Sequence, residues 1–193
     1  DLAVEFMVEG YERCFAENPE KVKRLRHRIE HCVIVDQDLI DRMARMNICP
    51  VLHPGLIQML GKNLASFYGP ERSRYLEAVR SMLDAGIKVS LHSDAPSGPV
   101  GIHVIDAAVN RYDRSKDYQF DQTQCVSVLD AIRCYTLHPA YASYQENIKG
   151  SIEVGKLADM IVLSDDILKI APMDIHKLKV DMTMIDGIVE YER

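Results

Sequence analysis

Three polar residues with the potential for metal binding or acid–base chemistry stand at the ends of short apolar stretches: His31, His53 and Asp94. Imidazole nitrogen and carboxylate oxygen are common ligands of divalent transition metals, and both groups also transfer protons. If the apolar stretches are parallel strands, their carboxyl ends share one face, and the three side chains converge there. Spacing alone leaves open the alternative that each is an ordinary core or turn residue.

Asp94 lies between the apolar run Val89–Leu91 and the turn-rich sequence Ala-Pro-Ser-Gly-Pro. An aspartate at the carboxyl end of a buried strand is where α/β barrels place their chemistry. Its alternative is an aspartate that opens the following turn, and for Asp94 taken alone this alternative is favoured. The presence of His31 upstream shifts the balance towards chemistry.

Helical patterns separate the apolar stretches, at about thirty residues per strand–helix unit. We expect strands over 29–35, 48–52 and 89–94, helices over 37–46 (capped by Asp36) and 75–85, and a loop from 53 to about 73. This alternation indicates an α/β fold with a parallel sheet and right-handed crossovers.

The flanking sequence predicts further helices and then a change from helical to β-like sequence. Helices are expected over 2–17, 102–111, 128–135 and 136–144, with a loop over 96–101 and a capping box at Ser127–Asp130. From residue 148 the sequence is turn-rich and β-like, and Asp186-Gly187 is typical of a type I′ hairpin between strands 180–185 and 188–191. We therefore divide the chain into residues 1–147 and 148–193.

Composition narrows the function classes. The 193 residues are 47% hydrophobic and carry a net charge of −6 with scattered Lys and Arg, which favours a globular protein that does not bind nucleic acid. Apolar runs fall short of the roughly 20 residues that span a membrane. Five dispersed cysteines without a Cys-x-x-Cys pair favour a reducing cytoplasm. Because the chain begins at Asp1 without a methionine, we expect residues to precede it.

Three motifs in order resemble the metal-dependent amidohydrolase superfamily, most closely amidohydrolase family 3, which includes N-substituted formamide deformylases. They are Arg28-Ile29-Glu30-His31, Ser93-Asp94-Ala95-Pro96 and the stretch from Gly150-Ser151 to Ala158-Asp159. The resemblance implies a (β/α)₈ TIM barrel with a small composite β-sandwich, and hydrolysis of a non-peptide C–N bond, usually an amide.

The resemblance also implies roles for individual residues. His31 matches the sixth-strand metal ligand, and Asp94 matches the eighth-strand aspartate that binds the metal, expected to be Zn²⁺, and acts as general base. His53 stands where the family often has Gln before Pro, and His92 where Gly commonly precedes Ser-Asp. Both are candidates for the substrate pocket, and the alternative is a strand-end histidine without a role. His103, His138 and His176 match no ligand position.

The family's His-x-His on the first strand and its fifth-strand His have no counterpart here, so we expect the C-terminal part of such an enzyme: strands six to eight and most of the sandwich. Since only two ligands are assigned, we expect the chain alone to be inactive and to hold metal weakly. Its expected partners are a small amide substrate and either a second copy or the missing N-terminal segment. Two alternatives stay open, a non-catalytic binding or regulatory member and a structural fragment.

Overall fold

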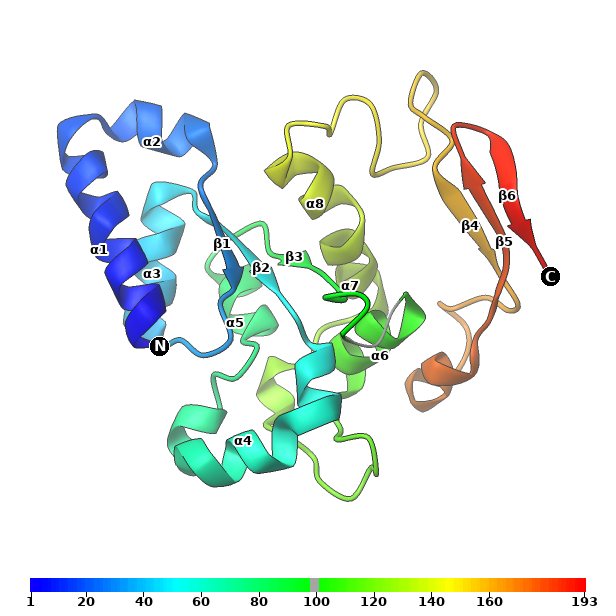
Figure 1. Cartoon of the computed structure of the whole chain (residues 1–193), viewed down its shortest axis with the longest axis horizontal. Helices are drawn as coiled ribbons and strands as arrows, with labels where there is room; N and C mark the ends of the chain where they lie inside the picture. Colours follow the sequence, from blue (N-terminus) through cyan, green and yellow to red (C-terminus); the bar gives the residue numbers. More distant parts are fainter. Residues whose placement is uncertain (98–100) are drawn as a thin grey trace.

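The structure is a computed structural model that describes residues 1–97 and 101–193. A parallel sheet lies at its centre, with helices α1 (Leu2–Glu17) and α3 (Gln37–Met46) on one side and α7 (Val128–Tyr135) and α8 (Leu137–Ala142) on the other (Figure 1). The loop expected over 96–101 lies partly outside the described residues.

The central sheet consists of β1 (Arg28–His31), β2 (Cys49–Leu52) and β3 (Ser90–Leu91), in that spatial order and all parallel. His31 pairs with Leu52, and Leu52 pairs with Leu91, so the three strands end at the same level. This confirms the expected parallel α/β arrangement. The described strands form an open sheet, not a closed barrel.

Local capping explains where the predicted helices begin. The Asp36 carboxylate accepts a hydrogen bond from the Leu39 backbone N–H at 2.9 Å at the start of α3, and the Ser127 hydroxyl accepts one from the Asp130 N–H at 3.1 Å at the start of α7. The other helices are α2 (Pro19–Leu25), α4 (Gly55–Ser73), α5 (Val79–Asp84), α6 (Ile102–Asn110) and the short 3₁₀ helices η1 (Gln122–Gln124) and η2 (Pro172–Lys177). The sequence had not predicted α2.

The prediction of a loop from residue 53 to about 73 was wrong, because helix α4 (Gly55–Ser73) occupies this segment. Its glycines and its proline suggested a loop, but Gly69, with φ 76°, and Pro70 form a kink near its end. Gly61 lies inside the helix, and the Phe120 ring packs where a side chain at this position would be, so the site requires glycine. The next helix, α5 (Val79–Asp84), begins later than the expected residue 75.

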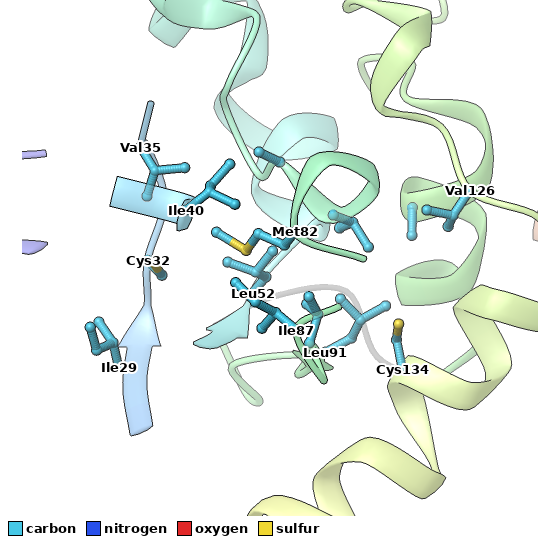
Figure 2. Close-up of a cluster of buried hydrophobic side chains, with 14 of the residues drawn as sticks. Ile29, Cys32, Val35, Ile40, Leu52, Met82, Ile87, Leu91, Val126 and Cys134 are labelled. Atoms are coloured by element: carbon cyan, nitrogen blue, oxygen red, sulfur yellow. The ribbon is translucent and has the colours of Figure 1, made fainter. Parts of the chain in front are cut away.

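The core fills the space between the central sheet and its helices (Figure 2). Ile40 and Met43 of α3, Leu52 of β2 and Met82 of α5 are completely buried. The burial of Ile40 and Met43 follows the predicted apolar face of α3, and all four residues belong to one core that joins the sheet to its helices.

A second, antiparallel sheet is formed by β4 (Met160–Leu163), β5 (Val180–Ile185) and β6 (Ile188–Glu192), at the other end of the molecule in Figure 1. Asp186 and Gly187 both have positive φ, 50° and 78°, as a type I′ turn requires, which confirms the predicted hairpin. The division at residues 147 and 148 stays a prediction. In the described part of the chain, no helix is long and apolar enough to cross a membrane.

Arg111 connects α6 to the start of α5 from inside the protein. The side chain is 1% exposed and donates hydrogen bonds to the carbonyl oxygens of Leu76 (2.8 Å), Glu77 (3.0 Å) and Asp121 (3.1 Å). The guanidinium therefore holds the segment that precedes α5 against α6.

We expect Arg111→Met to lower the free energy of unfolding by about 3–5 kcal/mol, because it leaves buried carbonyl oxygens without donors. Urea denaturation followed by circular dichroism measures this. The control Arg13→Met removes an exposed arginine and changes stability by no more than about 0.5 kcal/mol. Equal midpoints for the two variants would contradict a structural role for Arg111.

Candidate metal centre

The carboxyl ends of the three central strands bring four functional side chains together. His31 ends β1, His53 follows β2, and His92 and Asp94 follow β3. The His31 Nε2 atom lies 4.0 Å from the Asp94 Oδ1 atom, and the His92 ring centre lies 4.9 Å from that of His31 and 5.1 Å from that of His53. The predicted convergence of His31, His53 and Asp94 is confirmed as geometry, with His53 on the middle strand.

The backbone at two of these positions is unusual. His31 has φ 64° and Asp94 has φ 52°, both in the left-handed region that non-glycine residues seldom adopt. Such conformations persist where the surroundings enforce them, and they concentrate at functional sites. Each one turns the chain sharply at a strand end and directs a side chain into the cluster.

His53 is the buried member of the cluster, with 3% of its surface exposed. Its backbone N–H donates a hydrogen bond of 2.9 Å to Glu77 Oε2, and within the described residues its Nε2 atom has no hydrogen-bond partner. Burial lowers the pKa of His53, although Asp94 opposes the shift. The ring is therefore neutral near pH 7 and offers a free nitrogen lone pair.

The hydrogen bonding of the His92 ring differs from that of His53. Its Nδ1 atom accepts a hydrogen bond of 3.1 Å from the Asp94 backbone N–H. Since Nδ1 accepts, the ring proton of neutral His92 is on Nε2, which is buried and lacks an acceptor among the described residues. Burial, with His53 and His31 nearby, lowers the pKa of His92 and keeps the ring neutral.

Glu77 lies behind the cluster and was missed by the sequence analysis. The carboxyl group is completely buried, and burial raises its pKa to about 8, despite the His53 N–H and the nearby Arg111 guanidinium. In the described structure its Oε1 atom has no partner, which also favours the neutral acid. The one signal in the sequence was a charged residue inside the apolar run from Leu76 to Val79.

The other histidines lie outside the cluster, in keeping with the absence of a ligand role. The His138 Nδ1 atom is 2.9 Å from the Val89 carbonyl oxygen, which supports the strand that leads to His92. His103 and His176 line a cavity of about 540 Å³ between α6 and η2.

This cavity lies next to the cluster, since it is also lined by Gln58, which follows His53 in the sequence, and by Ser97, which follows Asp94. At its wall, the Asp106 carboxylate accepts hydrogen bonds from Gln58 Nε2 at 2.7 Å and Asn110 Nδ2 at 2.9 Å. His31, His53 and Asp94 do not line the cavity. It is therefore a neighbouring space and not the centre of the cluster.

The donor set suits a divalent transition metal. One ligand atom each from His31, His53 and Asp94 can be chosen so that all lie within 4.8 Å of one another. Two imidazoles and one carboxylate are a usual ligand set for zinc, and the buried, unpartnered His53 Nε2 is the kind of atom that a cation satisfies. The residues present therefore fit the metal.

A parallel sheet with histidines and an aspartate at its carboxyl edge is the type of site found in metal-dependent α/β hydrolases. The sequence model of the amidohydrolase family (Amidohydro_3) matches residues 1–191, and the chain belongs to this family. The resemblance inferred from three short motifs is thereby confirmed.

Individual relatives agree with this assignment. The chain is 34% identical to the N-substituted formamide deformylase of Arthrobacter pascens and 32% identical to the putative amidohydrolase YtcJ of Bacillus subtilis (strain 168), in both cases over 100% of its length. It covers 35% and 36% of these relatives, about a third of each. An uncharacterised metal-dependent hydrolase from Pyrococcus furiosus superimposes with a TM-score of 0.69 at 28% identity, covering 88% of this chain and 32% of that one.

The raised pKa of Glu77 makes stability depend on pH in a defined direction. Between about pH 5 and 8 the folded protein retains a proton on Glu77 that the unfolded chain has lost, so stability falls as pH rises. Glu77→Gln imitates the protonated acid and removes this loss. Relative to wild type, the variant should gain up to roughly 1.4 kcal/mol per pH unit across that window.

Urea denaturation of both proteins from pH 5 to 8.5, in the presence of a chelator, measures the difference. Titration of the histidines is common to both and cancels. A difference that is constant with pH would show that Glu77 is ionised in the folded protein.

Proposed function

We propose that the chain is part of a metal-dependent hydrolase that cleaves a non-peptide C–N bond of amide type, with His31 and Asp94 as metal ligands and Asp94 as general base. The observation that carries the proposal is the convergence of His31, His53 and Asp94 at one edge of a parallel sheet. Zn²⁺ is the proposed ion, because imidazole nitrogen and carboxylate oxygen are among its usual ligands.

We further infer that β1, β2 and β3 are the sixth to eighth strands of a (β/α)₈ barrel and that β4–β6 belong to a β-sandwich. Three parallel strands, connected through helices and with functional groups at their carboxyl ends, support the first inference. The share of each relative's length that the chain covers supports the second, since further strands are then available from elsewhere in the protein.

A bound divalent ion polarises a carbonyl and provides a water nucleophile near neutral pH. In the proposed mechanism the Asp94 carboxylate, 4.0 Å from His31, accepts the proton of the attacking water. As the C–O bond forms and the C–N bond breaks, that proton passes from Asp94 to the amine nitrogen. The products are a carboxylic acid and an amine.

His92 complements Asp94 as a hydrogen-bond donor to the substrate. The bond from the Asp94 N–H to its Nδ1 atom leaves the ring proton on Nε2, which is buried and has no acceptor in the described structure. A substrate carbonyl oxygen supplies that acceptor, and the bond strengthens as negative charge develops on the oxygen. The proposed substrate class is a small amide, and N-substituted formamides are the first to test because one relative carries that name.

We expect Asp94→Asn to reduce kcat/KM for hydrolysis by about 10²–10⁴-fold, because the amide cannot accept the proton. The fold should be kept, since Asn tolerates the left-handed backbone at this position. Release of amine from N-substituted formamides by the complete protein, as its gene encodes it, measures the effect. Asp117→Asn, an exposed change outside the cluster, is the matched control.

Two results would contradict the proposal. Full turnover by Asp94→Asn would remove Asp94 from the mechanism. Absence of hydrolysis in a complete, metal-loaded protein across several amide classes would favour a binding or regulatory member of the family.

A further inference from the structure

We propose that His53 is a third metal ligand, so that His31, His53 and Asp94 together hold a divalent transition metal ion. The inference rests on the proposed function in placing metal at His31 and Asp94, but it does not depend on hydrolysis. It replaces the expectation of two ligands and weak binding, and it gives His53 a role other than lining the substrate pocket.

The sheet order makes His53 the geometric partner of the other two residues. β2 lies between β1 and β3, so His53, directly after β2, follows the strand that pairs with both the strand of His31 and the strand before Asp94. The three ligand atoms lie within 4.8 Å of one another. Ligands bound at zinc distances are separated by about 3.4 Å in a tetrahedron, so modest side-chain rotations close the site.

The surroundings of His53 are arranged for a ligand. The residue is 3% exposed, and its backbone is fixed by the hydrogen bond from its N–H to Glu77 Oε2. The side chain nevertheless leaves Nε2 buried without a partner anywhere in the described chain. Buried polar atoms are nearly always satisfied, so a fixed and unpartnered nitrogen indicates a group that binds there.

His92 is close enough to compete for the ion, but its hydrogen bonding excludes it. The Asp94 N–H occupies Nδ1, and the proton on Nε2 occupies the other ring nitrogen. The ligand set is therefore two imidazole nitrogens and one carboxylate oxygen, which matches three protein ligands and an open fourth position. Zn²⁺ and Co²⁺ both accept this set.

Metal binding by the 193-residue chain tests the inference directly. Equilibrium dialysis against Zn²⁺ should give about one ion per chain, and Co²⁺ should produce the visible absorption bands of a low-coordinate nitrogen–oxygen site. His53→Gln and His31→Gln should each weaken Zn²⁺ binding at least about 100-fold, since each removes a ligand. His53→Ala is a second variant, read in place of His53→Gln if circular dichroism shows that the latter is unfolded.

A histidine control separates ligation from a general loss of imidazole. His103→Gln removes an exposed histidine outside the cluster and should keep the wild-type stoichiometry and affinity.

The outcomes distinguish this inference from the proposed hydrolase. Wild-type binding by a folded His53 variant, together with loss in His31→Gln, would overturn the role of His53 and leave the hydrolase proposal intact. Failure of the folded wild-type chain to bind Zn²⁺ or Co²⁺ would overturn the three-ligand site. A complete protein that binds zinc through His53 but cleaves no amide would contradict the hydrolase proposal alone.

Discussion

The register of the central sheet is the constraint on which the site depends. His31 pairs with Leu52, which pairs with Leu91, so the ends of the three strands are aligned. His53 and His92 are the next residues after β2 and β3, and they therefore lie at the same edge of the sheet as His31. A shift of one residue in either pairing would turn the side chains of that strand to the opposite face. The apolar faces of the strands and the helices on both sides fix the register, so the hydrophobic core indirectly sets the distances between the candidate ligands.

Behind the site, a second set of buried polar groups connects the chemistry to the helices. Arg111, directly after α6, donates hydrogen bonds to the carbonyl oxygens of Leu76 and Glu77, and the Glu77 carboxyl group accepts one from the backbone N–H of His53. This chain of contacts leads from the helical layer to the middle strand end. A group with a pKa raised to about 8 and a completely buried arginine are costly, and their retention beside the cluster is consistent with a positioning task.

Two neighbouring imidazoles differ in chemistry because of one hydrogen bond. The Asp94 N–H fixes the proton of His92 on Nε2 and makes this ring a donor, whereas the buried His53 Nε2 atom has no partner among the described residues. The proposed general base, the proposed donor and the candidate ligands therefore lie within a few residues of three strand ends. Such division of roles by environment is how a small set of residue types supports hydrolysis.

The sequence by itself determined what depends on local contacts: the Asp36 and Ser127 caps, the type I′ turn at Asp186-Gly187, and the strand–helix alternation that implied a parallel sheet. Three motifs also identified the family. Helix α4 was missed because Gly61 and Pro70 indicate a loop until the Phe120 ring and the kink are known. Only the tertiary structure selected Glu77 and Arg111 and separated His53 from His92, because burial, hydrogen-bond partners and tautomers arise from contacts between residues distant in the chain.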